Sequence, residues 1–201
     1  MTNTPLHLAS ASPRRRDILT GLGIPFSFSG EDVDEQALEG ESAATMVLRL
    51  AHDKAAAALP ARQGTAILGA DTAVVLGDRI FGKPGCRHEA MTMLAELSGR
   101  THEVMTGVVL LSGDEQITAL CRTEVRFRAI SPAESSAYWE SGEPLDKAGG
   151  YAIQGLAAVF VSELRGSYSG VMGLPVFETA AMLRAIGIEV LGRQSGRPRF
   201  D

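Results

Sequence analysis

The sequence contains only two cysteines, Cys86 and Cys121, and they stand far apart in the chain. Its four histidines are scattered, and no HExxH motif or Cys/His cluster occurs. Structural zinc needs grouped Cys and His ligands, and a disulfide scaffold needs several closely spaced cysteines. These absences argue against both kinds of stabilisation, so the fold must depend on its hydrophobic core.

Two further absences concern membranes and nucleic acids. No run of roughly 18 apolar residues occurs, and residues 1–5 show no basic segment leading into an apolar one. We therefore expect a cytoplasmic protein with no membrane partner. Lys and Arg number 19 against 24 Asp and Glu, which gives a net charge of -5. A sequence-independent grip on a nucleic acid polymer needs a basic surface, so such a partner is not expected.

What remains is the composition of an ordinary globular protein. Hydrophobic residues make up 45% of the 201 residues, and 22 glycines provide for many turns. A chain of this length can bury one substantial core, and no clear linker divides it. We expect a single two-lobed domain over residues 1–190, followed by a flexible tail over residues 191–201.

A strand, a tight turn and a helix are predicted at the start of the chain. The apolar run Leu6–Ala9 is typical of a buried strand, and Pro13 suits the first position of a helix. The turn carries Ser10 and Ser12, and three consecutive arginines follow Pro13. Backbone N–H groups, hydroxyls and guanidiniums gathered at a helix N-terminus would form a phosphate cradle. The alternative is that Ser12 caps an ordinary helix whose arginines are solvated.

Two features of the next segment each have an ordinary explanation and a functional one. The acidic stretch Glu31–Glu35 is either a solvated loop or a source of carboxylate ligands for magnesium. In the helix predicted over residues 42–59, Lys54 lies on the same stripe as the apolar Leu50. Its side chain either extends from the edge of the core into solvent or lines a cleft.

The strongest single candidate is Asp71. The apolar strand Ala66–Ala70 runs directly into it, and burying an unpaired carboxylate is costly, so a carboxylate at such a strand end indicates function. A hairpin at Gly77-Asp78 then leads to Lys83. Pro84 holds that lysine at a turn, because proline cannot continue an interior strand.

The rest of the chain reads as a mixture of helices and strands. Helices are predicted over residues 13–22, 88–97, 132–139 and 171–186, strands over 26–29, 101–111, 116–127 and 156–164, and a turn over 166–170. The segment over residues 142–155 is too long and too rich in glycine and charge for a plain connection. We expect it to carry function.

The side chains singled out along the chain carry both signs of charge. The cationic and hydroxyl groups are Ser10, Ser12, Arg14, Arg15, Lys54, Lys83 and Lys147, and the acidic groups are Glu35, Asp71 and Asp146. A polyphosphate bound with a divalent metal needs both signs, because cations hold phosphate oxygens and carboxylates hold the metal. No Walker or kinase motif is present, which favours hydrolysis by a metal-activated water.

Seven motifs in order carry a resemblance to one family. They are Leu-Ala-Ser-Ala-Ser-Pro-Arg-Arg at 8–15, Gly-Ala-Asp-Thr at 69–72, Gly-Lys-Pro at 82–84, Thr-His-Glu-Val-Met-Thr-Gly at 101–107, Glu-Pro-Leu-Asp-Lys-Ala-Gly at 143–149, Ile-Gln-Gly at 153–155 and Gly-Leu-Pro at 173–175. The sequence resembles the Maf family of nucleoside triphosphate pyrophosphatases over residues 6 to about 186. The resemblance implies a mixed α/β fold like that of inosine triphosphatases, with a central mixed sheet and an active-site cleft between two lobes. It also implies cleavage between the α- and β-phosphates.

Within this family the sequence is most similar to the branch that acts on dTTP and UTP, which is marked by Arg14, Thr72 and Gln154. The resemblance implies that Asp71 is the general base and that Thr72 and Gln154 read the pyrimidine edge. The implied catalytic residues are Asp71, Lys54 and Lys83, the ligands of Mg²⁺ or Mn²⁺ are Glu35 and Asp71, and the substrate-binding residues are Ser10, Ser12, Arg14, Arg15, Thr72, Lys147 and Gln154.

Other hypotheses stay open on the sequence. One is a nucleotide-sensing regulator of cell division that binds the same ligands with little turnover, although a pure binder has no need of a buried base such as Asp71. A nucleic-acid-binding module built on the arginine run fits the acidic net charge poorly. A homodimer is a further hypothesis, with Tyr138, Trp139 and the end of the last helix as candidate contacts.

Overall fold

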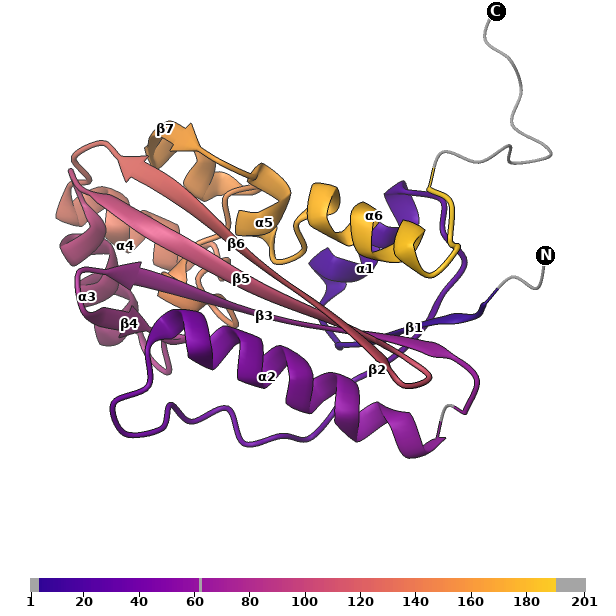
Figure 1. Ribbon diagram of the computed structural model, residues 1–201. Coiled ribbons are helices and arrows are strands. Elements are labelled where there is room, and N and C mark those ends of the chain that lie inside the picture. The colour runs from indigo at the N-terminus through magenta and orange to yellow at the C-terminus, as the bar shows by residue number, and fades with distance from the viewer. Residues whose placement is uncertain (1–3, 62, 191–201) are drawn as a thin grey trace, which may run out of the picture.

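The computed structural model describes residues 4–61 and 63–190, and a mixed seven-stranded sheet lies at its centre (Figure 1). The strand order is β2-β1-β3-β5-β6-β7, and β4 pairs with β3 beside this path. The strands are β1 (Leu6–Ala9), β2 (Ser27–Ser29), β3 (Ala66–Leu76), β4 (Arg79–Phe81), β5 (Thr101–Ser112), β6 (Glu115–Phe127) and β7 (Val161–Arg165). β1 runs parallel to β2 and β3, whereas the other pairings are antiparallel. The expected mixed α/β fold with a central mixed sheet is confirmed.

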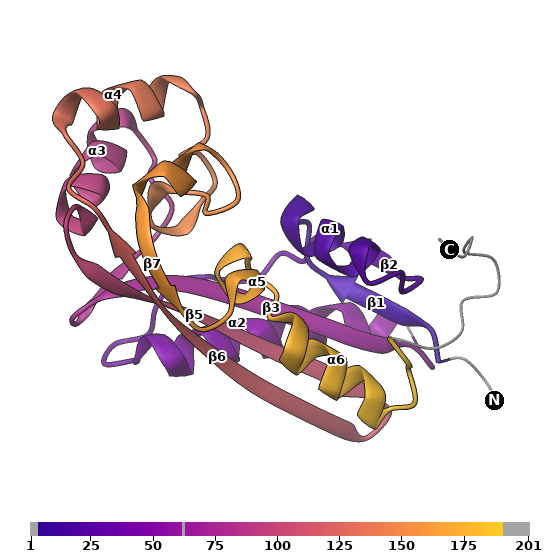
Figure 2. The same cartoon turned by 90° about the horizontal axis from the view of Figure 1, so that it is seen from above.

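Helices cover both faces of this sheet. They are α1 (Pro13–Gly21), α2 (Ala43–Ala58), α3 (Arg87–Leu97), α4 (Pro132–Glu140), α5 (Tyr168–Met172) and α6 (Val176–Ala185), with 3₁₀ turns at Leu59–Ala61, Ala148–Gly150 and Leu156–Phe160. In Figure 1, α2 lies along one face of β3 and β5, while α1, α5 and α6 lie on the opposite face. Figure 2 shows α3 and α4 together at one end of the sheet and α1 with β1 near the other. None of the helices in the described residues is long and apolar enough to cross a membrane.

Helix α2 lies unusually close to the sheet. A Cβ atom at Gly69 on β3 would lie 2.0 Å from the carbonyl oxygen of Ala51, and one at Gly107 on β5 would lie 2.5 Å from that of Val47. Only glycine at both positions allows the helix backbone to rest directly on the strands. This contact fixes Lys54, which follows Ala51 by three residues, above β3.

Most of the predicted elements are confirmed to within a few residues. The helix expected over residues 13–22 is α1, the helix expected over 42–59 is α2, and the long hairpin is β5 and β6. Ser42 caps α2 by accepting a hydrogen bond from the backbone N–H of Thr45, and Ser131 and Glu134 form a complete capping box on α4.

Three predictions for the C-terminal part were wrong. The strand expected over residues 156–164 begins only at Val161, because Leu156–Phe160 forms a 3₁₀ helix. The turn expected over residues 166–170 is partly helical, since Ser167 caps α5. Gly173, with φ of 112°, ends that helix, and α6 begins after Pro175 instead of at residue 171. The tail expected over residues 191–201 lies outside the described residues.

Asp71 does not stand at a strand end, as the sequence had suggested. It lies in the middle of the eleven-residue strand β3, paired in register with Gly107 of β5. The strand continues past Asp71 because its backbone stays paired with β5 from Ile67 to Val75. At Asp71 the backbone of β3 is paired with β5 alone, because its pairing with β1 ends at Leu68 and its pairing with β4 begins at Val74. The carboxylate therefore lies in the gap between β1 and β4.

Candidate active site

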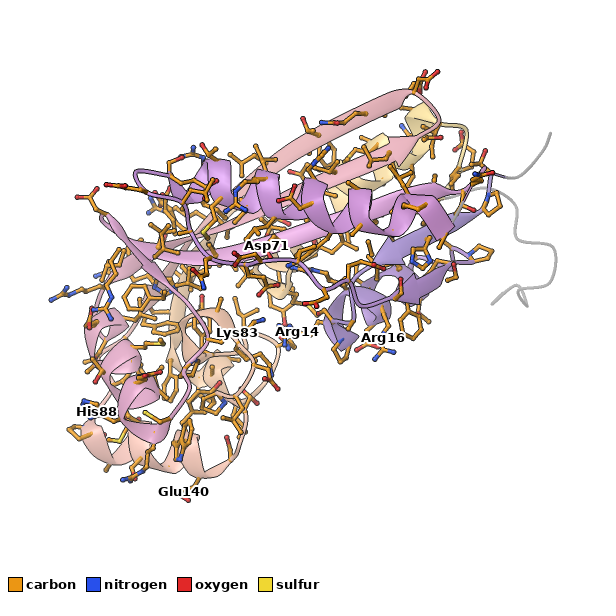
Figure 3. The ribbon with its side chains drawn as sticks, turned by 90° about the horizontal axis from the view of Figure 1, so that it is seen from below. Arg14, Arg16, Asp71, Lys83, His88 and Glu140 are labelled. Carbon is orange, nitrogen blue, oxygen red and sulfur yellow. The ribbon has the colours of Figure 1, made fainter. Side chains whose placement is uncertain are left out.

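A cavity of about 920 Å³ opens above the middle of β3. It is lined by the β1–α1 turn, the loop after β2, α2, β3, the β4 end with Lys83, the segment 143–155 and the end of α5. In Figure 3, Arg14, Asp71 and Lys83 gather toward one region, while Arg16, His88 and Glu140 lie away from it. Segments far apart in sequence thus contribute to one cavity of the size typical for small-molecule sites.

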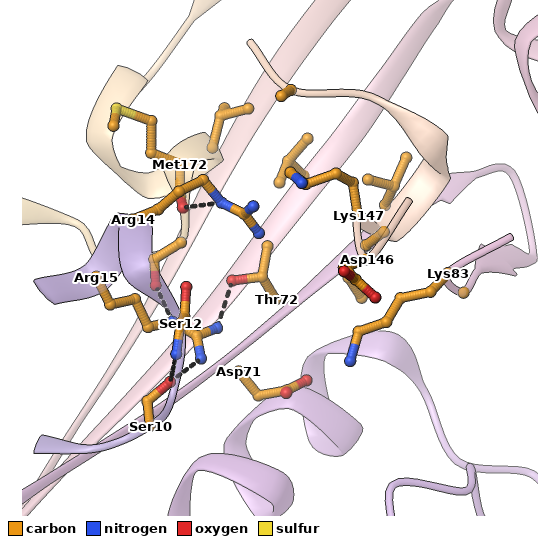
Figure 4. A pocket seen from close by; sticks show the side chains of 18 of the residues that line it. Ser10, Ser12, Arg14, Arg15, Asp71, Thr72, Lys83, Asp146, Lys147 and Met172 are labelled. Atoms are coloured by element: carbon orange, nitrogen blue, oxygen red, sulfur yellow. Dashed lines mark hydrogen bonds between the residues drawn. The ribbon is translucent and has the colours of Figure 1, made fainter. Parts of the chain in front are cut away.

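Arg15 ties three of these segments together (Figure 4). Its buried guanidinium donates to the carbonyl oxygen of Gly173 at 2.7 Å, to Ser10 Oγ at 3.0 Å and to Thr72 Oγ1 at 3.2 Å. Burial lowers the pKa of Arg15, and the nearby charge of Asp71 opposes that effect. Three of the five N–H donors of this side chain are therefore committed to the protein, which leaves two for a ligand.

Thr72 continues this network away from the arginine. Its Oγ1 lies 2.9 Å from Thr106 Oγ1, and Thr106 Oγ1 donates to the carbonyl oxygen of Gly170 at 2.8 Å. Because the only hydroxyl proton of Thr106 is used in that hydrogen bond, Thr72 must be the donor to Thr106. Thr72 also accepts from Arg15, so what its hydroxyl can still offer a ligand is one acceptor lone pair.

Lys54 lies between two carboxylates on the other side of the cavity. Its Nζ atom is 2.6 Å from Glu35 Oε1 and 2.7 Å from Asp71 Oδ1, and Lys83 Nζ lies 3.3 Å from Glu35 Oε2. Lys54 and Asp71 are buried, with exposed fractions of 8% and 9%. Burial raises the pKa of Glu35, but the hydrogen bonds and charges of Lys54 and Lys83 together lower it below its ordinary value.

The opposite wall is formed by Arg14 and the segment 143–155. Arg14 Nε donates to the carbonyl oxygen of Met172 at 3.4 Å, and Lys147 Nζ donates to that of Leu145 at 3.0 Å. Burial lowers the pKa of Arg14, and the charge of Asp146 opposes that effect. Burial and the charge of Arg14 together lower the pKa of Lys147. Among the described residues, Asp146 is the only one other than glycine with a positive φ, at 62°.

The structure brings every predicted site residue to this cavity. Its lining includes Ser10, Ser12, Arg14, Arg15, Glu35, Lys54, Asp71, Thr72, Lys83, Asp146, Lys147 and Gln154. Ser12 stands at the N-cap of α1, but its side chain makes no capping hydrogen bond within the described residues. The simple capping alternative therefore fails to account for Ser12, whereas the roles of the individual residues stay predictions.

The sequence offered the acidic stretch Glu31–Glu35 as a whole but singled out only Glu35, and Glu31 also lines the cavity. Its carboxylate accepts a hydrogen bond from Ser29 Oγ, and His7 Nε2 lies 2.7 Å from the same hydroxyl. The signal was available, because Glu31 follows β2 at the edge where the parallel strands β1 and β2 both end. Because four of the five residues in the stretch 31–35 are acidic, the sequence alone does not show which of these carboxylates face the cavity.

Residues able to hold a metal are few. Within the described part of the chain, no group of three or more His, Cys, Asp or Glu side chains is placed to hold a metal ion. Glu35 and Asp71 do approach the same ammonium nitrogen of Lys54, so their oxygens lie on one side of the cavity. Two carboxylates completed by phosphate and water oxygens suit Mg²⁺, which prefers oxygen ligands and keeps several waters.

Comparisons with known proteins agree on one family. A family model described as Maf-like protein matches residues 5–186. The chain is 52% identical over 184 residues to a protein of Methylococcus capsulatus named dTTP/UTP pyrophosphatase, covering 91% of both chains. It is 50% identical to a Saccharophagus degradans protein of the same name, covering 92% of this chain and 90% of that one.

Solved structures were compared as well. The Ham1 protein of Staphylococcus aureus superposes with a TM-score of 0.44 at 14% identity, covering 62% of this chain and 72% of that one.

Proposed function

This chain belongs to the family of Maf-like proteins, and from that premise we propose that it hydrolyses dTTP and UTP to the nucleoside monophosphate and pyrophosphate. Relatives 52% and 50% identical over most of their length are named dTTP/UTP pyrophosphatases. The observation that carries the proposal is the row Lys83, Glu35, Lys54 and Asp71, in which cations and carboxylates alternate along one side of the cavity. A triphosphate bound with a divalent metal needs that alternation.

Binding of the triphosphate falls to the cationic and hydroxyl groups around the cavity. Arg14 and Lys147 approach from one wall and Lys54 and Lys83 from the other, while Ser10 and Arg15 lie at the β1–α1 turn. Placed on both sides of a polyphosphate, these groups would hold its oxygens and stabilise the charge that develops on the pyrophosphate leaving group.

Glu35 and Asp71 would hold a divalent cation, Mg²⁺ or Mn²⁺. When bound, such an ion neutralises charge on the phosphates and activates the attacking water. Asp71 would then serve as the general base. Its Oδ1 accepts from Lys54, while its Oδ2 accepts no hydrogen bond within the described residues and is the oxygen free to take a proton.

Thr72 and Gln154 would select the base. The single lone pair that Thr72 still offers suits a donor such as the N3–H of uracil or thymine. Gln154, exposed at the cavity, offers both a donor and an acceptor for the neighbouring carbonyl oxygens. Cytosine has no N3–H and carries an amino group in place of O4, so this arrangement would disfavour it.

The proposal also covers the domain organisation, the cellular location and the oligomeric state. We propose one two-lobed domain over residues 1–190, a cytoplasmic location where nucleoside triphosphates are present, and a homodimer. Tyr138 cannot serve as a dimer contact, because its side chain is buried. The substrates include modified pyrimidine nucleotides in this proposal, since pocket contacts to the pyrimidine edge leave other positions of the base unread.

The test is to incubate the protein with dTTP, UTP, CTP, GTP and 7-methyl-GTP and Mg²⁺ and to identify the products. We expect monophosphate and pyrophosphate from dTTP and UTP, and loss of turnover with EDTA that Mg²⁺ or Mn²⁺ restores. Nucleoside diphosphate with orthophosphate would overturn the proposal. Tight binding of dTTP without turnover would instead favour the nucleotide-sensing regulator.

A further inference from the structure

Tyr138 and Glu143 form a hydrogen-bonded pair that the chemistry above does not use; Tyr138 is buried, and Glu143 is half-buried at the lining of the cavity. Tyr138 accepts a hydrogen bond from the backbone N–H of Ala152 at 3.1 Å and donates to Glu143 Oε1 at 2.7 Å. Glu143 also accepts from the backbone N–H of Leu156 at 2.9 Å and of Ala157 at 3.2 Å. Three donors thus converge on one carboxylate and hold it in place.

Gly155 is required by the same pair. A Cβ atom at position 155 would lie 2.2 Å from Glu143 Oε2, so any side chain there would expel the carboxylate. The backbone N–H of Gly155 donates to the carbonyl oxygen of Ala152 at 3.0 Å, which closes a tight turn. The chain from 152 to 157 is therefore wrapped around the Glu143 carboxylate.

Gln154 lies inside this wrapped segment. The backbone N–H of Ala152, before Gln154, is hydrogen-bonded to Tyr138. The backbone N–H groups of Leu156 and Ala157, after it, are hydrogen-bonded to Glu143. The side chain of Gln154 is exposed at the cavity. The Gln154 amide has no hydrogen-bond partner within the described residues, so the backbone on both sides of Gln154 sets the direction of its side chain. Lys147 lies in the same closed loop, between Glu143 and Ala152.

We propose that Tyr138 and Glu143 are positioning residues for base selection: they fix the turn that aims Gln154 at the pyrimidine. This inference rests on the proposed function, since it assumes that Gln154 reads the base. A site built to pair with polar edges discriminates strongly only when its groups are held in place. Loosening the turn should therefore reduce discrimination between bases more than it reduces binding of the triphosphate.

The test compares Tyr138→Phe, Glu143→Gln and the double variant with the unaltered protein. Phenylalanine leaves the Ala152 N–H without its acceptor, and glutamine presents an amide nitrogen where the carboxylate accepted from a backbone N–H. We expect the UTP-over-CTP ratio of kcat/KM to fall about tenfold in each single variant. The double variant should lose little more, because the two residues act as one unit.

Glu134→Gln is the matched control. It is the same chemical change, and Glu134 belongs to α4 like Tyr138, but its contacts are the capping box with Ser131 and the ion pair with Arg128. It should lower stability and leave the UTP-over-CTP ratio unchanged. If all variants lower the ratio in proportion to their loss of stability, the pair is merely structural and the inference is overturned.

A binding measurement separates this inference from the proposed activity. Calorimetric titration with the α,β-imido analogues of dUTP and dCTP needs no turnover. If the unaltered protein binds the dUTP analogue but does not hydrolyse UTP or dTTP, the proposed activity fails, yet a loss of dUTP preference in the variants still supports the positioning role. Equal binding of both analogues by the unaltered protein, or an unchanged preference in the variants, overturns it.

Discussion

At the scale of single residues, Lys54 explains how a carboxylate can sit in the middle of a buried strand. Asp71 is 9% exposed, and its partner Lys54 is buried to a similar degree. A buried charge is tolerated when it is paired and hydrogen-bonded, and Lys54 pairs with Asp71 and Glu35 together. The same ion pair that stabilises Asp71 also holds it where the proposed reaction needs a base.

Asp71→Asn tests that role directly. Asparagine keeps the shape of the side chain but cannot accept a proton from water, so kcat should fall by about 10²–10⁴-fold. Steady-state hydrolysis of dTTP measures the loss, and titration with α,β-imido-dUTP checks that binding persists. Asp114→Asn, in the exposed turn between β5 and β6, should leave kcat unchanged. A loss of less than tenfold for Asp71→Asn would mean that another carboxylate is the base.

Asp146 carries a different kind of constraint, since its φ of 62° is one that side chains rarely adopt. Aspartate and asparagine tolerate the left-handed region better than branched residues do. Asp146→Val should therefore lower the free energy of unfolding by about 1–3 kcal/mol, whereas Asp146→Gly and Asp146→Asn should change it by less than about 1 kcal/mol. Urea unfolding measures all three. An equal loss in Val and Gly variants would point to contacts of the carboxylate instead of backbone strain.

At the scale of elements, the contact between α2 and the sheet links stability to the site. Gly107 lies opposite Asp71 in the β3–β5 register, and a Cβ atom there would lie 2.5 Å from the carbonyl oxygen of Val47 in α2. A methyl group there has to push against the carbonyl oxygen of Val47, which is backbone and cannot rotate away. Any shift of α2 also moves Lys54.

Gly107→Ala should therefore affect two measurements together. We expect the free energy of unfolding to fall by about 1–3 kcal/mol because of overpacking. We also expect kcat to fall, because Lys54 moves away from Asp71. Gly21→Ala is the control, since a Cβ there meets nothing within 4 Å and lies in α1; it should be neutral or slightly stabilising. Normal stability and activity in Gly107→Ala would show that α2 is not seated as described.

The elements also show where sequence reasoning succeeds. Local signals were sufficient where a proline or a capping serine marks the start of a helix, as at Pro13, Ser42 and Ser131. Those helices were predicted to within a residue or two. They failed at Leu156–Phe160, an apolar run that reads as a strand. That segment is 3₁₀ because its backbone N–H groups at Leu156 and Ala157 are bound by Glu143, thirteen residues away or more. No local pattern contains that partner.

At the scale of the whole molecule, the sheet gathers the site from segments between Ala9 and Gly173. The motifs identified most of the cavity-facing residues, and the acidic stretch and the helix over 42–59 supplied Glu35 and Lys54. They could not show that Arg15 is largely occupied by Ser10, Thr72 and the Gly173 carbonyl, or that Thr72 offers only an acceptor. Those limits follow from long-range hydrogen bonds, which exist only once the sheet is formed.

His102 makes the stability of the whole fold depend on pH. It is 2% exposed in the core beside Phe127 and Tyr151, and its Nε2 lies 2.8 Å from the Tyr151 hydroxyl. Its Nδ1 atom is buried and has no hydrogen-bond partner in the part of the chain that the structure describes. Burial lowers the pKa of His102 from 6.5 to about 4. Between these two values the unfolded chain binds a proton that the folded chain excludes, so protonation favours unfolding.

The free energy of unfolding should therefore be steady above about pH 6.5 and decrease as the pH falls toward 4, by about 2–4 kcal/mol from this residue. Urea unfolding at intervals between pH 4 and 8 measures the slope. His102→Phe should be less stable at neutral pH, because Tyr151 loses its partner, but should show a flatter dependence on pH. The exposed His88 provides the control, and His88→Gln should keep the slope of the unaltered protein. An unchanged slope in His102→Phe would assign the acid sensitivity to the carboxylates of the cavity instead.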